Sequence, residues 1–272
     1  MTQGYEPTDE LFAVKNRQPD ERDVAPPNGS QPSLGAGVGW SALMLVMVSV
    51  SAFVYMIGYS VYLTLMQPHS ATLLDVDTIE TLTLAHSESV DALFGLLGLE
   101  TLFVLPLLLF AAHFKGQSWR KTLAVQTFSR YSFWLASWLF LAYLAVSVSV
   151  DILWVSEPDD FIAKMLGTKS LWASIALVVF APLVEEFFFR GYLFAMLRST
   201  RLGAWGTLVM TSLLFTLAHA GQYQWSVLFV VGLLALFLGY VREKSGSIWL
   251  PILFHALNNL LAVVFVIWLG VS

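Results

Sequence analysis

The sequence predicts an all-α fold, a polytopic transmembrane bundle of about seven, at most eight, membrane helices. Of the 272 residues, 57% are hydrophobic and 12% are charged, whereas a soluble domain averages roughly 25% charged residues. Apolar stretches near the roughly 20 residues that a helix needs to cross a bilayer recur along the chain. Tryptophans stand near the ends of these stretches, at the headgroup level that indole prefers. A soluble fold is excluded because the polar residues are too few to cover its surface.

Seven apolar stretches define the expected helices, near 38–66, 90–113, 131–155, 171–197, 203–220, 224–241 and 247–270. Before them, residues 1–37 carry five prolines, mixed charges and almost no apolar run, which predicts a disordered cytoplasmic tail. Residues 38–272 then form a membrane-embedded domain. The fifth and sixth stretches are short and are joined by only three residues, so they could instead form a helical pair that does not fully cross.

Basic residues gather in alternate loops, and acidic residues gather in the loops between them. The positive-inside rule therefore places the N-terminus in the cytoplasm and the C-terminus outside, and we expect a multi-pass protein of a bacterial inner membrane. The net charge of −5 gives no support to nucleic-acid binding, and the absence of cysteine excludes disulfides, thiolate nucleophiles and cysteine-ligated metals. The basic residues used here are Lys15, Arg17, Arg22, Lys115, Arg120, Lys121, Arg130, Arg198, Arg201, Arg242 and Lys244.

Charged side chains in the fourth stretch call for an explanation, because each costs a few kcal/mol in a bilayer even on lenient scales (about 2.5–3.5). Arg190 follows Glu186 by four residues, so the two share a helical face and can pair. Glu185 is rotated by about 100° from Glu186 and is freer to face a cavity. Pro182 cannot donate a backbone hydrogen bond and is expected to kink the helix before the glutamates.

Two histidines and an amide follow on later stretches. His219 lies four residues after Phe215, and His255 lies four residues before Asn259, so that His255 and Asn259 share a helical face. A lone buried histidine is usually a packing residue. Two histidines, an amide and an unpaired glutamate in one half of the chain instead indicate a reactive site.

These groups can hydrolyse a peptide bond without a covalent intermediate. A glutamate in an apolar site can act as a general base on water, and a histidine can polarise that water or protonate the leaving amine. A second histidine and an amide can donate to an oxyanion. Alternatively, Glu185, His219 and His255 could hold zinc with one open coordination position. Spacing alone does not separate the two mechanisms.

Three motifs carry a resemblance to a known family: E-E-x-x-x-R, F-x-x-x-H and H-x-x-x-N, in this order on consecutive apolar segments within about 170–265. Ala181-Pro182 precedes the first motif, and Ser247-Ile248-Trp249-Leu250-Pro251 precedes the last. Together they resemble the CPBP family of intramembrane proteases. That group includes CAAX prenyl proteases of the Ras-converting type and Abi-like, bacteriocin-processing enzymes.

The resemblance implies a role for each motif residue. Glu185 is the expected water-activating base with His219 as its partner, His255 and Asn259 stabilise the oxyanion, and Glu186 with Arg190 supports the site. We therefore expect an endopeptidase that acts on a membrane-bound CAAX-like protein or peptide in the lipid bilayer. No cofactor is expected, and zinc is the alternative.

Two other functions stay open from the sequence. A membrane scaffold or immunity protein could keep this fold and only bind a partner. A proton-coupled transporter is the second alternative, because buried carboxylates also serve proton relays. Glu100 in the second stretch favours the transporter slightly, since it lies outside the three motifs.

Overall fold

Helices make up nearly all of the computed structural model, which describes residues 33–66, 75–114, 118–154 and 159–270, and no strand occurs within those ranges. Most of the predicted tail, residues 1–32, lies outside the described residues. The first helix begins at Leu34, four residues before its predicted start, because the Ser33 side chain caps it by accepting the N–H of Ala36.

The helices follow one another in chain order, and the fourth predicted stretch is one long helix, Leu171–Arg198, built from five consecutive segments. We call it the motif helix. The elements are α1 (Leu34–Leu65), α2 (Val76–Ser87), α3 (Val90–His113), α4 (Trp119–Thr122), α5 (Arg130–Trp154), α6 (Asp160–Met165), α7 (Leu171–Ile175), η3 (Ala176–Phe180), α8 (Ala181–Glu186), η4 (Phe187–Leu193), α9 (Phe194–Arg198), α10 (Gly203–Ala218), α11 (Trp225–Ser245), α12 (Trp249–Ala262) and η5 (Val263–Leu269).

Six of these helices are long and apolar enough to cross a membrane, and α10 is a shorter apolar helix. The polytopic helical bundle predicted from composition is therefore confirmed. The fifth and sixth predicted stretches correspond to α10 and α11. α10 ends at Ala218, just before its predicted end at 220, whereas α11 continues to Ser245, past its predicted end at 241. The prediction stopped α11 at residue 241 because Arg242, Glu243 and Lys244 follow, but long charged side chains can leave a helix end for the interface.

α2 occupies a segment that the sequence reading treated as a loop. Its start is fixed by Asp75, whose side chain accepts the N–H of Thr78 at 2.7 Å. The hydrogen bond holds the pKa of Asp75 below its usual value. Hydropathy alone missed this helix because polar residues interrupt its apolar positions.

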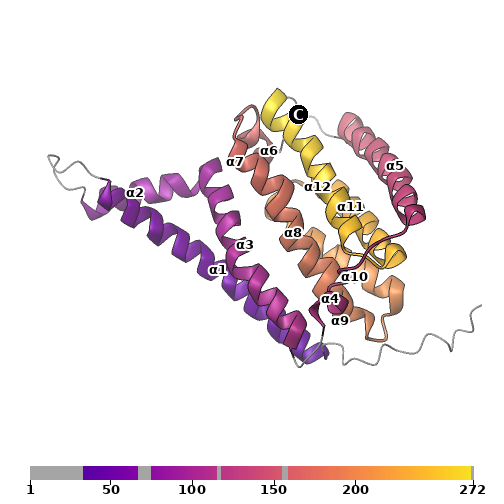
Figure 1. Ribbon diagram of the computed structural model, residues 1–272. Coiled ribbons are helices and arrows are strands. Elements are labelled where there is room, and N and C mark those ends of the chain that lie inside the picture. Colours follow the sequence, from indigo (N-terminus) through magenta and orange to yellow (C-terminus); the bar gives the residue numbers. More distant parts are fainter. Residues whose placement is uncertain (1–32, 67–74, 115–117, 155–158, 271–272) are drawn as a thin grey trace, which may run out of the picture. The chain divides into compact units, whose positions relative to one another are not determined.

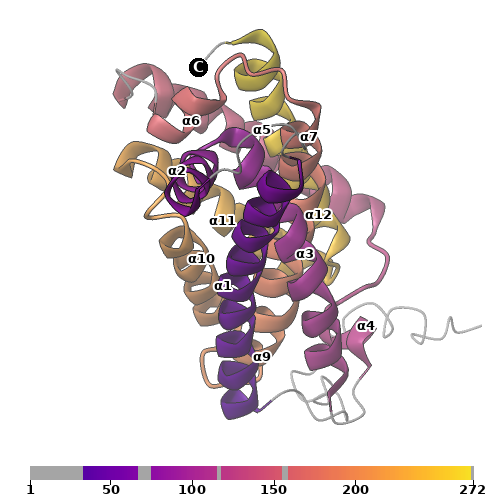
Figure 2. The ribbon, with the colours of Figure 1, turned by 90° about the vertical axis from the view of Figure 1, so that its left-hand side faces the viewer.

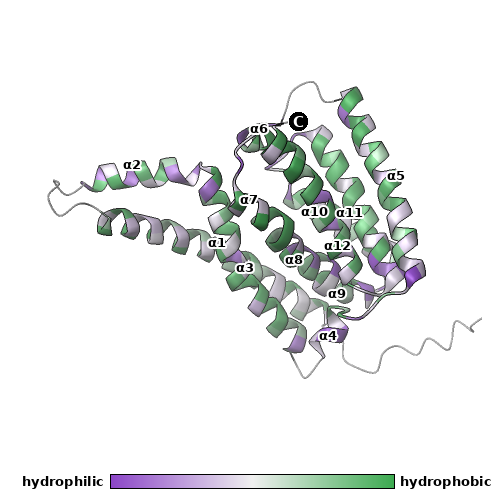
Figure 3. Cartoon of the chain, turned by 45° about the horizontal axis from the view of Figure 1, so that its top comes forward, coloured by the Kyte–Doolittle hydropathy of each residue, from purple (hydrophilic) through white to green (hydrophobic). Residues whose placement is uncertain are grey.

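The motif helix packs between α3 and α12, while α1 packs along α3 (Figure 1). On the other side, α11 contacts α5, α10 and α12, and Figure 2 shows the same bundle from the side of α1 and α2. Apolar residues dominate the long helices, and hydrophilic residues concentrate near helix ends and in α2 and α4 (Figure 3). This distribution is the one expected of helices that face lipid.

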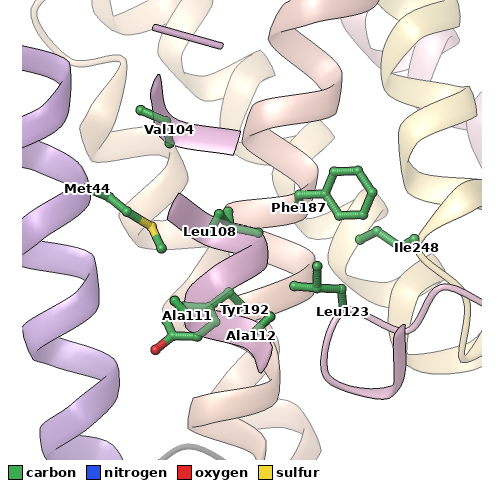
Figure 4. Packing of buried hydrophobic residues seen from close by; sticks show 9 residues of the cluster. All are labelled: Met44, Val104, Leu108, Ala111, Ala112, Leu123, Phe187, Tyr192 and Ile248. Atoms are coloured by element: carbon green, nitrogen blue, oxygen red, sulfur yellow. The ribbon is translucent and has the colours of Figure 1, made fainter. Parts of the chain in front are cut away.

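A buried apolar cluster joins α1, α3 and the motif helix (Figure 4). Leu108 of α3 is fully buried, and Phe187 and Tyr192 approach it from the motif helix. Met44 adds a contact from α1, and Ile248 one from the residue just before α12. Phe187 of this cluster directly follows Glu186. The packing of the cluster therefore fixes how the segment with the two glutamates is rotated and where it lies along α1 and α3.

Three hydrogen bonds between residues 124–126 and residues 246–248 fix where α12 begins. The Ile248 N–H donates to the carbonyl oxygen of Ala124 at 3.0 Å. The Gln126 side chain donates to the Gly246 carbonyl at 2.6 Å, and Ser247 Oγ donates to the Gln126 carbonyl at 2.5 Å. These bonds hold the start of α12 two turns ahead of His255.

Candidate active site

Two π-helical segments flank the short stretch of α-helix that carries both glutamates. η3 ends at Phe180, and η4 begins at Phe187. Pro182 stands at the start of α8 between them. Such segments widen the helical turn locally and occur frequently at functional sites. Pro182, at which the sequence predicts a kink, thus lies where η3 passes into α8.

Glu185 faces two histidines from other helices. Its Oε2 lies 4.0 Å from Nε2 of His219 and 3.8 Å from Nε2 of His255. These separations exceed hydrogen-bond distance, and Glu185 Oε2 has no hydrogen-bond partner among the described residues. The Glu185 side chain is 25% exposed. Residues 185, 219 and 255, which the sequence singled out separately, therefore point their polar atoms at one place.

Glu186 and Arg190 form the buried ion pair that their spacing predicts. Nη1 of Arg190 lies 3.0 Å from Oε1 of Glu186, and both side chains are 0% exposed. Nη2 of Arg190 donates to the carbonyl oxygen of Ala235 on α11 at 2.9 Å. The guanidinium carbon also lies 4.4 Å from the centre of the Phe215 ring. The pair thereby ties the motif helix to α10 and α11.

The same Glu186 oxygen also binds His255, a contact that the sequence reading missed. Nδ1 of His255 lies 2.9 Å from Oε1 of Glu186. Because an ionised carboxylate only accepts hydrogen bonds, Nδ1 is the nitrogen that carries the proton. Nε2 of His255 is therefore the atom turned toward Glu185. No local spacing could have indicated this contact, since the two residues are 69 positions apart.

His219 is oriented in a similar way by its own helix. It is the C-cap residue of α10, and its Nδ1 lies 2.8 Å from the carbonyl oxygen of Phe215. A carbonyl accepts only, so Nδ1 carries the proton and Nε2 is free to accept one. The F-x-x-x-H spacing thus has a direct structural reason: the Phe215 carbonyl fixes the His219 tautomer.

Asn259 makes a backbone contact that its predicted role did not include. Its Nδ2 donates to the carbonyl oxygen of Leu177 at 2.9 Å. In the π-helical register of η3, that carbonyl would accept from the residue five positions later, which is Pro182 and has no N–H. Asn259 therefore supplies the missing donor and ties α12 to the motif helix. Its Oδ1 accepts from Asn258, whose own Oδ1 accepts from the Tyr143 hydroxyl of α5.

Glu100 is an acidic residue of α3, and α3 packs against the motif helix. It shares a helical face with Leu97 and Val104, both of which pack against the motif helix. Glu100 therefore lies on the face of α3 that packs against the motif helix, although it is outside the three motifs.

The alternative zinc site can be compared with this geometry. Both histidines turn Nε2 toward Glu185 and donate their other ring N–H, an orientation that zinc sites also use. Within the described ranges, however, no group of three or more His, Asp or Glu side chains is arranged to hold a metal ion. Glu185, His219 and His255 do not fit a zinc site as they stand, and no reaction step proposed below uses a metal.

Comparison with known proteins gives a family match over part of the chain. Residues 167–261 match the family described as type II CAAX prenyl endopeptidase Rce1-like. This segment contains all three motifs, and the match confirms the resemblance that they carried.

A curated relative and the solved structures add little about function. An uncharacterized 24.3 kDa protein of Escherichia coli is 33% identical over 140 residues, covering 47% of this chain and 63% of that protein. The chain thus spans less than two thirds of this relative's length. No solved structure matches the chain.

Proposed function

We propose that this multi-pass membrane protein is an intramembrane endopeptidase that hydrolyses a peptide bond of a membrane-associated substrate with a water activated by Glu185. One observation carries the proposal: an unpaired glutamate oxygen faces Nε2 of both His219 and His255. Atoms separated by 3.8 to 4.0 Å leave a position between them that one water can share. The match to an endopeptidase family supports the same class of reaction.

In the proposed first step, the Glu185 carboxylate removes a proton from this water, and the oxygen attacks the substrate carbonyl. His255 in its protonated form donates Nε2–H to the oxyanion. Glu186 orients His255 for this donation, because Oε1 of Glu186 lies 2.9 Å from Nδ1 of His255. The buried Arg190 in turn holds Glu186 in place through their 3.0 Å contact.

The second step breaks the carbon–nitrogen bond of the tetrahedral intermediate. The leaving amine needs a proton, and the proton that Glu185 took from water is the source. His219 can relay it, because Nδ1 is held by the Phe215 carbonyl and Nε2 lies near both Glu185 and the substrate position. The products are a carboxylate and an amine, so one water is consumed and no group stays on the protein.

The substrate class follows from the location and the family. Glu185 and His255 lie on helices that are long and apolar enough to cross a membrane, and His219 ends the shorter apolar helix α10. A substrate therefore has to reach the site from within or beside the lipid bilayer. CAAX-like prenylated peptides are the first candidates, because the matched family is described by that activity. Unmodified membrane peptides are the second candidates. A catalytically silent scaffold of the same fold would bind either one without cleaving it.

The test compares the purified protein with its Glu185→Gln variant on two internally quenched peptides, one farnesylated at a C-terminal CAAX sequence and one unmodified. We expect cleavage by the wild type and none by Glu185→Gln, with the thermal unfolding temperature of the variant unchanged. Glu243→Gln, which removes a partly exposed carboxylate paired with Arg198 at 3.3 Å, serves as the matched control and should cleave normally. Full activity of Glu185→Gln would exclude the general-base role, and binding without cleavage by the wild type would indicate a scaffold.

A further inference from the structure

Tyr223 lies beside the site on the turn that joins α10 to α11. The backbone N–H groups of Gln222 and Tyr223 both donate to the carbonyl oxygen of His219, at 3.0 and 3.3 Å. This turn brings the Tyr223 ring nearly parallel to the His219 imidazole, with ring centres 6.1 Å apart and planes 9° apart. The tyrosine and the histidine are therefore set by one short piece of backbone.

A distant segment holds Tyr223 from its other side. The Phe161 ring of α6 meets the Tyr223 ring edge-on, with centres 5.3 Å apart. The buried Asp159 ties the two segments together, because its Oδ1 accepts the Phe161 N–H at 2.9 Å and its Oδ2 accepts the Gln224 N–H at 2.6 Å. Tyr223 is thus held by its neighbour His219 on one side and by Phe161 of α6 on the other. Both contacts restrict the position of its hydroxyl.

The Tyr223 hydroxyl has the chemistry of a neutral hydrogen-bond donor. Burial raises the pKa of Tyr223, and the charges of Glu185 and Asp159 raise it further. The phenol therefore stays protonated at any pH at which a peptidase works. Gln222 Nε2 donates to the hydroxyl oxygen at 3.4 Å, and no acceptor for the hydroxyl hydrogen is present in the described part of the chain. The stacking of the Tyr223 ring on His219, whose Nε2 lies 4.0 Å from Oε2 of Glu185, places the tyrosine beside the reacting groups.

In the proposed reaction the oxyanion can receive the Nε2–H of His255 and at most one N–H of Asn259. Asn259, the donor implied by the family resemblance, already gives one N–H to the carbonyl of Leu177. His255 has Nδ1 engaged with Glu186, which leaves only Nε2 for the substrate. Oxyanion sites usually combine at least two donors, and a tyrosine hydroxyl is among the side chains that serve.

We propose that Tyr223 is a further catalytic residue, whose hydroxyl donates a hydrogen bond to the substrate carbonyl oxygen as that oxygen becomes an oxyanion. The ring of Tyr223 also keeps His219 in the plane that its relay role needs. This inference rests on the proposed peptidase function and adds a residue outside the three motifs.

Two variants separate the hydroxyl from the ring. Tyr223→Phe keeps the stacking contact and removes only the hydroxyl, whereas Tyr223→Leu removes both. With the farnesylated quenched peptide, Tyr223→Phe should lower kcat by about 100-fold, the typical loss for one oxyanion donor, with little change in KM. Tyr223→Leu should lower kcat at least as far. Tyr131→Phe, which removes the hydroxyl of an exposed tyrosine on α5, is the control and should keep the wild-type kcat.

Binding of a phosphinate analogue of the same peptide gives a second readout. A phosphinate carries a stable tetrahedral oxyanion, so Tyr223→Phe should weaken its binding at least 10-fold while leaving binding of the uncleaved parent peptide unchanged. Wild-type kcat in Tyr223→Phe, or unchanged phosphinate affinity, would overturn the inference and leave the peptidase proposal intact. If the wild type neither cleaves the peptide nor prefers the phosphinate, the peptidase proposal fails and the role of Tyr223 fails with it.

Discussion

Oε1 of Glu186 lies 2.9 Å from Nδ1 of His255, on a helix that begins more than 60 residues later in the chain. The same oxygen lies 3.0 Å from Nη1 of Arg190. Glu186 therefore links a local ion pair to a long-range contact with a histidine of the candidate site. The first contact orients the His255 ring, and the second pairs the buried charge of Arg190.

Glu186→Gln should destabilise the protein strongly. The variant leaves the Arg190 guanidinium buried and without its carboxylate, and breaking a buried ion pair in this way costs about 3 to 5 kcal/mol. Thermal or denaturant unfolding in detergent measures the loss. Glu243→Gln breaks the partly exposed pair with Arg198 and should cost less than about 1 kcal/mol. Equal stability of the two variants would contradict a structural role for the Glu186–Arg190 pair.

Asn259→Ala should cost stability because it leaves the Leu177 carbonyl without a donor. A fully buried carbonyl that loses its partner costs about 1 to 3 kcal/mol. The bond between Asn259 and Leu177 is partly buried, so we expect a loss of about 1 kcal/mol. Pro182→Ala restores a backbone N–H at the position that the π-helical register assigns to this carbonyl. In the Pro182→Ala background, the cost of Asn259→Ala should therefore fall by about half or more, and a double-mutant cycle measures this coupling.

The control for this cycle uses another proline inside a membrane helix. Pro106 lies within α3, away from Leu177, so Pro106→Ala should leave the cost of Asn259→Ala unchanged. Additive effects of Asn259→Ala and Pro182→Ala would mean that the two residues do not share the Leu177 carbonyl.

Catalysis should proceed without a bound metal. Glu185 and His219 already supply a base and a proton relay, so a metal is redundant in the proposed steps. We expect full activity after treatment with a chelator and far less than one equivalent of zinc in the purified, active protein. One equivalent of zinc, with activity lost on chelation and regained on zinc addition, would instead make Glu185, His219 and His255 its ligands.

The orientation predicted from the charged residues can be tested by cysteine labelling, because the chain has no native cysteine. Asp77 lies exposed on α2, and Lys121 lies on α4 with Arg120 beside it. By the positive-inside rule, Asp77→Cys should react with a membrane-impermeant maleimide from outside the cell, and Lys121→Cys only after the membrane is opened. The reverse pattern would place the N-terminus outside.

The sequence by itself determined the class of the fold and the short-range parts of the site. Hydropathy identified the long helices because a bilayer demands runs of apolar residues, and most of their ends fall within a few residues of the prediction. The Glu186–Arg190 pair followed from helical periodicity, since both residues lie on one helix. The motifs were sufficient to predict the family that residues 167–261 match.

Only the tertiary structure decided which polar groups meet. The Glu186–His255 contact and the bond from Asn259 to the Leu177 carbonyl join different helices. Helix periodicity fixes directions around one axis and carries no information about how two axes pack, so neither contact could be predicted from spacing. Tyr223 was passed over for the same reason: its position beside His219 depends on a turn, and its other support comes from Phe161, across the bundle.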